Sequence, residues 1–424
     1  MSAGGERVTV VFFRTGYDSL GGGSKMLLRL LERLDRERFE PVLLTQREDG
    51  VARRAREAGV EVRVVPYRGV LDTYDGGLLD AGPRRVPRLG FRILQFNAEA
   101  RDVFARADVL WCNGLRTYLT ALPASLAGSA PVVWNIGLLR ESTGAVRHLN
   151  RLALATTDYA FIESRRQARR GFTAAQYRAY REKLVVFHKG IDTEEFDPRR
   201  VEAGGVEASG ADEGATGGAD ERASSSGWVD EWSVGQGEGD RPLRVGTAAL
   251  INPRKGLDDL LAAARLLAES RDDVVFAVAG APARPEDEAH LADLLAQREA
   301  YGLTERVSFL GWVEDVPSYL AGLDVFVLPS HNEGIPGAVR EASAMELPVV
   351  ATDVGGTADV VADGVTGLLV DPGEPADLAA AVERLLSNPD ERRAMGERGR
   401  RRIVESFSLR SYVADYESFL ARVA

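Results

Sequence analysis

Residues 328–370 read LPSHNEGIPGAVREASAMELPVVATDVGGTADVVADGVTGLLV, and this stretch decides the fold of the second half of the chain. A β-rich run at 324–329 leads into it, helical spacing follows at 336–345, and a second strand is predicted at 348–352. Strands separated by helices of this length pair in parallel through right-handed crossovers. The stretch therefore predicts an open parallel sheet, which binds ligands at the carboxyl ends of its strands.

The same alternation of strands and helices extends over most of the 424 residues. Apolar runs typical of buried strands occur at 8–13, 41–45, 60–65, 108–113, 131–136, 158–163 and 183–188, and again at 243–250, 274–279 and 307–310. Helical spacing lies between them, including one long helix predicted at 87–107 and three closing helices near 375–387, 389–405 and 409–423. The pattern predicts an α/β protein with two Rossmann-like domains, at 1–198 and 242–407.

The segment 199–241 between these domains has a different composition. It is rich in Gly, Ala, Ser and acidic residues, and residues 201–240 contain ten acids and one Arg. So little apolar surface cannot offset the entropy lost on ordering. We expect a disordered insertion here.

Composition excludes several classes of protein. An apolar share of 45% and a charged share of 28% are typical of a globular chain. A single cysteine, Cys112, excludes a disulfide framework and a cysteine-built metal site. No apolar run approaches the roughly 18 residues of a membrane helix, and the N-terminus has no signal-peptide core. We expect a soluble cytoplasmic protein without a structural metal.

The loops of the 328–370 stretch carry two acids and several glycines suited to a phosphorylated ligand. Glu333 lies in the turn after the predicted strand, and Glu341 lies about a turn and a half into the helix, where it could accept hydrogen bonds from a ribose. The helix N-terminus between them offers free N–H groups and a partial positive charge to a phosphate. A second turn, Gly355–Gly356, can bring further N–H groups close to a diphosphate.

These residues resemble the signature of retaining, nucleotide-sugar-dependent glycosyltransferases of family four, the glycosyl transferases group 1 proteins. The matching positions are Pro329, Ser330, Glu333, Gly334, Pro336, Glu341 and Ala342, followed by 348–356 and 363–370. The resemblance implies the GT-B architecture, in which two Rossmann-like domains face each other across a cleft. It also implies that a C-terminal helix, at 408–424, crosses back to the N-terminal domain.

The resemblance assigns roles to individual residues. Glu333 would face the donor sugar, Lys255 and the neighbouring Arg254 would hold the donor diphosphate, and Glu341 would bind the ribose. Further donor contacts would come from Gly334, Ile335, Pro336, Gly355, Gly356, Gly22 and Gly23. A fixed cation stabilises the charge that develops on the leaving phosphate. The implied reaction is front-face transfer of a sugar, without a protein nucleophile, a metal or another cofactor.

The sequence departs from the family pattern at several positions. Leu250 stands where the family has an arginine five positions before Lys255, and Glu346 replaces a small residue. Asp359 replaces a longer carboxylate, and no histidine follows the strand at 131–136. These departures keep two alternatives open: a non-catalytic nucleotide-sugar-binding protein and a nucleotide-sugar epimerase.

Charge is divided unevenly along the chain. Residues 1–200 contain 33 Lys and Arg against 24 Asp and Glu, whereas residues 201–424 contain 20 against 40. A basic region attracts phosphates and anionic lipid headgroups. The charge is consistent with an anionic or lipid-linked acceptor and peripheral contact with the inner face of the membrane, and no feature indicates nucleic acid. The simpler interpretation is a solvated surface rich in arginine.

Overall fold

The computed structural model describes residues 7–15, 22–72, 86–136, 144–202 and 241–424. The predicted insertion at 199–241 therefore lies almost entirely outside the described residues, as do residues 16–21 of the glycine-rich turn before the first helix. The chain forms two compact units. Unit 1 comprises Met1–Gly190 and Arg410–Ala424, and unit 2 comprises Ile191–Leu409. Residues 191–202, which precede the insertion, thus belong to unit 2.

Unit 1 contains a seven-stranded parallel sheet in the order β3-β2-β1-β4-β5-β6-β7. Its strands are β1 (Val8–Arg14), β2 (Phe39–Thr45), β3 (Glu61–Val64), β4 (Val109–Asn113), β5 (Val132–Asn135), β6 (Tyr159–Ile162) and β7 (Leu184–Val186). The central strand β1 pairs with both β2 and β4, and its residues 10–13 are fully buried. The order reverses beside β1, as in a doubly wound Rossmann sheet.

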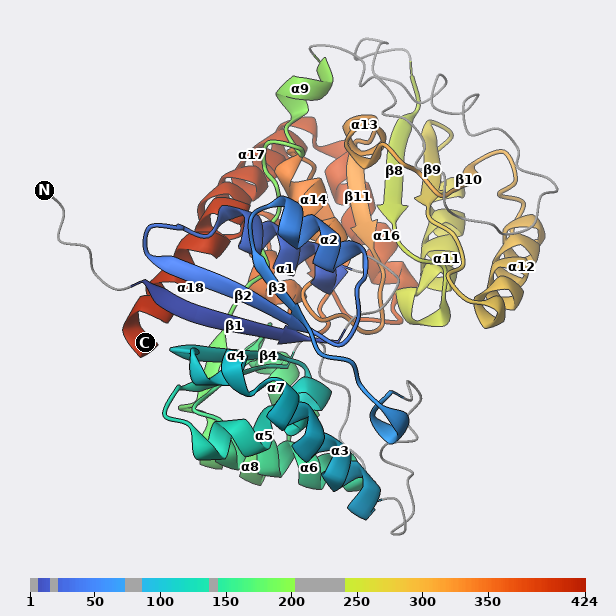
Figure 1. Cartoon of the computed structure of the whole chain (residues 1–424). Helices are drawn as coiled ribbons and strands as arrows, with labels where there is room; N and C mark the ends of the chain where they lie inside the picture. Colours follow the sequence, from blue (N-terminus) through green and yellow to red (C-terminus); the bar gives the residue numbers. More distant parts are fainter. Residues whose placement is uncertain (1–6, 16–21, 73–85, 137–143, 203–240) are drawn as a thin grey trace, which may run out of the picture. The chain divides into compact units, whose positions relative to one another are not determined.

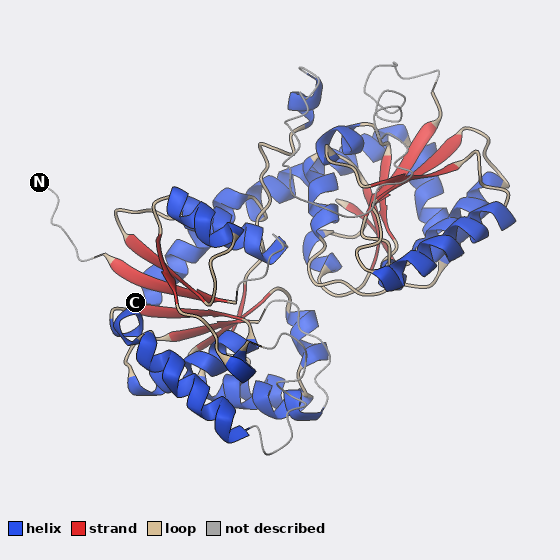
Figure 2. Ribbon diagram, turned by 45° about the vertical axis from the view of Figure 1, so that its right-hand side comes forward, coloured by secondary structure: helices blue, strands red, loops and turns tan. Residues whose placement is uncertain are grey.

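Helices cover both faces of this sheet (Figure 2). The helices are α1 (Gly22–Arg33), α2 (Gly50–Glu57), α3 (Val86–Glu99), α4 (Arg101–Ala105), α5 (Leu115–Ala127), α6 (Gly144–Thr156), α7 (Arg165–Gly171) and α8 (Ala174–Tyr180), with a short 3₁₀ turn at Gly69–Leu71. Helices α3, α5, α6 and α8 pack one against the next, and their apolar sides share one core with the sheet (Figure 1). The single helix predicted at 87–107 is two helices, because the backbone leaves the helical range at Ala100 (φ −95°, ψ 8°).

The last helix of the chain, α18 (Leu409–Val423), packs against unit 1. Phe419 and Tyr416 contact Trp111 of β4 and Phe161 of β6, and the Phe161–Phe419 ring centroids are 4.7 Å apart. Glu417 also accepts a hydrogen bond from the backbone N–H of Asp35 after α1. The expected return of the C-terminal helix to the N-terminal domain is therefore confirmed.

Unit 2 contains a six-stranded parallel sheet in the order β10-β9-β8-β11-β12-β13. Its strands are β8 (Leu243–Ala248), β9 (Val274–Ala279), β10 (Val307–Gly311), β11 (Val325–Leu328), β12 (Val349–Thr352) and β13 (Gly367–Val370). Its helices are α9 (Pro198–Glu202), α11 (Leu257–Ala268), α12 (Pro285–Ala300), α13 (Val316–Ala321), α14 (Gly337–Ala344), α15 (Thr357–Val360), α16 (Pro375–Ser387) and α17 (Pro389–Ser406), with a 3₁₀ turn at Pro253–Lys255. Two apolar clusters, one on each face of the sheet, form its core. Two Rossmann-like units of this kind confirm the predicted GT-B fold class.

Candidate functional site

The predicted donor-binding residues of unit 2 follow three strands that are neighbours in its sheet. The order β8-β11-β12 places their carboxyl ends side by side. The loop after β8 contains Arg254 and Lys255, the loop after β11 contains Glu333, and the loop after β12 contains Gly355 and Gly356. Sequence positions 100 residues apart thus meet at one edge, where parallel sheets bind ligands.

Lys255 and Glu333 form an ion pair at the centre of this edge. Lys255 Nζ lies 2.6 Å from Glu333 Oε1, and the two side chains are 15% and 8% exposed. Ser330 is fully buried just after β11, and its hydroxyl group donates a hydrogen bond to the same Oε1 of Glu333 at 2.8 Å. A charge pair so withdrawn from water holds both groups in a fixed geometry.

The turn that contains Arg254 and Lys255 is hydrogen-bonded to the loop after β11. The backbone N–H of His331 donates to the carbonyl of Arg254 at 2.9 Å. Gly256 ends the turn with φ +62°, and a Cβ atom built there would lie 2.1 Å from the carbonyl oxygen of Pro329. Only glycine allows this approach. The exposed Arg254 guanidinium lies 3.4 Å from the carbonyl oxygen of Asn332, so Arg254 and Lys255 are two cations beside Glu333.

The double glycine after β12 folds back on the backbone of Glu333 and Gly334. The N–H of Gly356 donates to the carbonyl of Gly334 at 2.6 Å. Gly355 has φ +55°, and a Cβ atom there would lie 1.8 Å from the carbonyl oxygen of Glu333. These contacts determine the backbone path beside the Lys255–Glu333 pair.

Helix α14 begins at this edge with its first turn uncapped. Pro336 is its N-cap, so the helix starts at Gly337, one residue later than the sequence pattern predicts. No side chain caps the N-terminus, and no acid lies in the first turn. Glu341 lies one turn further along and is half-buried. The uncapped N-terminus of α14, beside two cations, makes this edge suited to a phosphorylated ligand.

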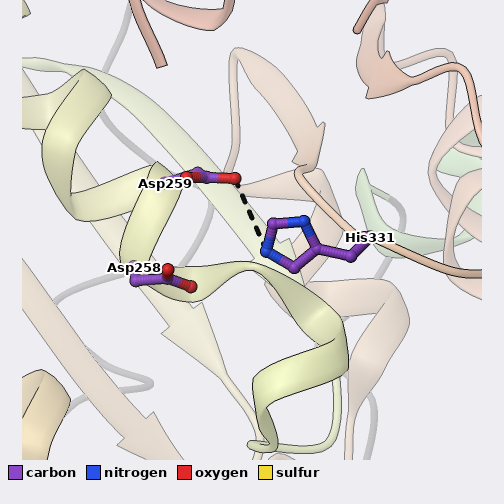
Figure 3. Close-up of side chains that lie close together, drawn as sticks. All are labelled: Asp258, Asp259 and His331. Carbon is purple, nitrogen blue, oxygen red and sulfur yellow. Dashed lines mark ion pairs between the residues drawn. The ribbon is translucent and has the colours of Figure 1, made fainter. Parts of the chain in front are cut away.

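A second charged cluster lies beside the same loops (Figure 3). Asp258 and Asp259 occupy the first turn of α11, and His331 Nε2 lies 3.6 Å from Asp259 Oδ2. Burial, and next the neighbouring Asp258, raise the pKa of Asp259. In the described part of the chain, Asp258, Asp259 and His331 are the one group of acidic, histidine or cysteine side chains close enough together to bind a metal ion. Acids are also favourable at a helix N-terminus without any ion, so the cluster does not by itself indicate a metal site.

Within unit 2, the structure brings predicted residues of three loops together at one edge of the sheet. The other two predicted donor contacts, Gly22 and Gly23, lie in the first turn of α1, in unit 1. Ile335 is buried in the unit 2 core, and Leu250 is 41% exposed beyond the end of β8. The sequence pattern predicts no role for Ser330, although this residue lies three positions before Glu333.

Comparison with known proteins finds similarity in the second half of the chain. Residues 229–402 match the family model of glycosyl transferases group 1. The chain is 37% identical to alpha-D-kanosaminyltransferase of Streptomyces kanamyceticus over 161 residues, 37% of this chain and 40% of that protein. It is 37% identical to D-inositol 3-phosphate glycosyltransferase of Salinispora tropica over 184 residues, 42% of this chain and 37% of that protein. The chain thus spans less than half the length of these curated relatives.

Solved structures resemble the whole chain in fold. Anabaena HepE in complex with UDP has a TM-score of 0.73 at 17% identity and covers 98% of this chain and 100% of its own. Sucrose-phosphate synthase from Thermosynechococcus elongatus has a TM-score of 0.70 at 18% identity, covering 98% and 99%. At these identities the likeness shows the fold, which is that of two Rossmann-like domains.

Proposed function

We propose that the protein is a retaining glycosyltransferase that moves a sugar from a nucleotide-diphosphate sugar to an acceptor. The Lys255–Glu333 ion pair at the carboxyl edge of the unit 2 sheet carries the proposal. The pair places a cation next to a carboxylate, close to the uncapped N-terminus of α14 and the turn at Gly355–Gly356. The match of residues 229–402 to glycosyl transferases group 1 supports the same activity.

In this proposal each side chain performs one task. Lys255 and Arg254 hold the diphosphate and stabilise the negative charge that develops as the bond to the sugar breaks. Glu333 contacts the sugar, and Glu341 accepts hydrogen bonds from the ribose. The N–H groups of Gly334 and Gly355 bind the same ligand, and Gly356, whose N–H donates to the carbonyl of Gly334, holds the turn in place.

The ion pair has a consequence for binding. Because Lys255 is paired with Glu333, a diphosphate must compete with a carboxylate at 2.6 Å for the ammonium group. Removing one partner alone leaves the other partner buried without a counter-charge. We therefore expect that Lys255→Ala and Glu333→Ala each lower stability, and that the double variant is less destabilised than the sum of the two.

The finer features of the reaction belong to the same proposal. We propose transfer with retention of anomeric configuration, without a metal, in the cytoplasm, to an acceptor that is anionic or lipid-linked. Excess EDTA should leave the rate unchanged, and Asp259→Asn should abolish neither donor binding nor transfer. A rate that falls with EDTA and returns with a divalent cation would instead assign a metal to the Asp258, Asp259 and His331 group.

The test is turnover of a panel of UDP-, GDP- and ADP-sugars by the purified protein, first by hydrolysis and then with candidate acceptors. Lys255→Ala should lower kcat by about 10²–10³, the usual effect of removing one donor to a developing anion. The matched control is Arg271→Ala, which removes the cation of the Arg271–Glu383 pair on the same unit, away from the site. Turnover at the wild-type rate in both Lys255→Ala and Glu333→Ala would refute the proposal.

Leu250 favours a second candidate, a non-catalytic nucleotide-sugar-binding protein. The family resemblance places an arginine at this position, and a leucine contributes no charge to a diphosphate. Leu250 is 41% exposed, so the longer side chain of Leu250→Arg would be accommodated. Binding of a nucleotide sugar by calorimetry, with no turnover in the wild type and turnover in Leu250→Arg, would favour this candidate. Conversion of the donor sugar to its epimer without an acceptor would identify the epimerase alternative.

A further inference from the structure

Helix α3 of unit 1 exposes apolar side chains on the face that it turns away from its own core. Phe91 and Leu94 are 65% and 61% exposed, and the exposed Pro87 and Ala98 extend the row at helical spacing. The opposite side of the helix is also apolar, because Leu89, Ile93 and Phe96 pack into the unit 1 core. A helix that is apolar on both sides is normally covered on both sides.

The exposed apolar residues of unit 1 are concentrated on this side of its sheet. Among its described residues, the large hydrophobic side chains exposed to solvent are Phe91 and Leu94 of α3, Leu126 of α5 and Leu152 of α6. These helices pack in the order α3, α5, α6 in the lower layer of Figure 1. Grouped apolar side chains on a surface mark a contact with another molecule or with a membrane.

The same helices are basic. Helices α3, α5 and α6 together contain five arginines and one acid, Glu99. Arg88, Arg147 and Arg151 are exposed on α3 and α6, and α5 and α6 contain no acid. A surface that combines protruding apolar side chains with arginines complements a bilayer with anionic headgroups, where the apolar groups enter the acyl boundary and the cations stay among phosphates.

We propose that the α3–α5–α6 surface of unit 1 binds peripherally to an anionic lipid bilayer, with Phe91 and Leu94 inserted at the interface. The apolar row distinguishes this occupant from a nucleic acid, which would require cations but not a projecting phenylalanine and leucine. The inference concerns a different surface from the donor site and does not depend on transferase activity.

The test is co-sedimentation of the full chain with vesicles of phosphatidylcholine alone and of phosphatidylcholine with 30% phosphatidylglycerol. The wild type should bind the anionic vesicles and bind them more weakly at 0.5 M salt. The double variant Phe91→Ser/Leu94→Ser should bind about tenfold or more weakly, because two apolar side chains no longer leave water. Arg88→Gln/Arg151→Gln should lower binding to anionic vesicles only.

The matched control is Trp312→Ser/Val404→Ser, which removes one aromatic and one aliphatic exposed side chain from unit 2. It should bind vesicles as the wild type does, and all variants should keep the wild-type melting temperature. Three results would overturn the proposal: no binding of the wild type to anionic vesicles, equal loss of binding in the control, or a wild-type dimer in light scattering that Phe91→Ser/Leu94→Ser dissociates.

Discussion

At Gly355 the absence of a side chain is a requirement of the site. Its backbone has φ +55°, and an added Cβ would lie 1.8 Å from the carbonyl oxygen of Glu333. The backbone at Glu333 would have to move, and the carboxylate that pairs with Lys255 would move with it. Gly355→Ala therefore affects the geometry of the site as well as the local strain.

We predict that Gly355→Ala lowers, at least tenfold, the affinity for the nucleoside diphosphate of whichever donor sugar turns over, measured by calorimetry. Gly364→Ala is the matched control, because Gly364 has a similar φ of +68° but no atom within 4 Å of the added Cβ. Both variants cost about 1–2 kcal/mol in backbone strain, so any difference in nucleotide affinity reports the contact with Glu333. Equal affinities in the two variants would contradict this role of Gly355.

At the scale of elements, Asp197 joins the segment before α9 to helix α17. Its carboxylate accepts hydrogen bonds from Arg199 at 2.7 and 2.9 Å and pairs with Arg400 at 3.1 Å. The hydrogen bond from Arg199, with a further contribution from Arg400, lowers the pKa of Asp197 to about 2. Arg400 also donates to the carbonyl oxygens of Phe196 and Ala344, so one buried guanidinium holds three segments of unit 2 together.

The direction of the pKa shift predicts a pH dependence. A lowered folded-state pKa contributes stability above the unfolded value of 3.8, and this contribution is lost as the pH falls through about 2. Asp197→Asn should therefore lower the free energy of unfolding by about 1–2 kcal/mol at pH 7, a figure reduced because Arg199 is largely exposed. The difference from the wild type should shrink below pH 4 in denaturant titrations. A constant difference down to pH 2 would show that the charge is not its source.

The sequence predicted elements with strong periodicity and missed those whose limits depend on packing. The strands at 8–13, 274–279 and 348–352 agree with β1, β9 and β12 to within about one residue. Strand β13 was missed because Gly367–Val370 is a short run after a turn and is a strand only through pairing with β12. The break at Ala100 between α3 and α4 was missed because the apolar spacing continues through it.

For the candidate site, the sequence predicted which residues take part but not how they pair with one another. The turn after a predicted strand identified Glu333, and the family resemblance identified Lys255. Their ion pair joins residues 78 positions apart and follows from strand order, which residue spacing does not encode. The same holds for the His331–Asp259 contact, which no sequence pattern predicts.

At the scale of the molecule, the chain leaves unit 1 after Gly190 and returns to it at Arg410. The returning helix covers aromatic residues of β4 and β6, and Phe419 is 3% exposed there. We predict that Phe419→Ala destabilises unit 1 by about 3–5 kcal/mol, because it leaves a cavity among packed rings. Phe91→Ala is the control and should change stability by less than about 0.5 kcal/mol, because Phe91 is 65% exposed.

Scanning calorimetry should resolve this effect, since two units need not unfold in one step. Phe419→Ala should lower the transition temperature of unit 1 and leave that of unit 2 unchanged, whereas the nucleotide that the donor panel identifies should raise the transition temperature of unit 2. Equal shifts of both transitions in Phe419→Ala would show that α18 stabilises the two units together.

The discontinuity of unit 1 also determines the order of events on the ribosome. Residues 191–409 are translated before α18 is complete, which at about 5–20 residues per second takes roughly 10–40 s. During that interval α18 does not yet cover Trp111 of β4 and Phe161 of β6, while unit 2 can already fold. Unit 2 can therefore fold before unit 1 is complete, and until α18 is made the aromatic side chains of β4 and β6 lack the helix that covers them.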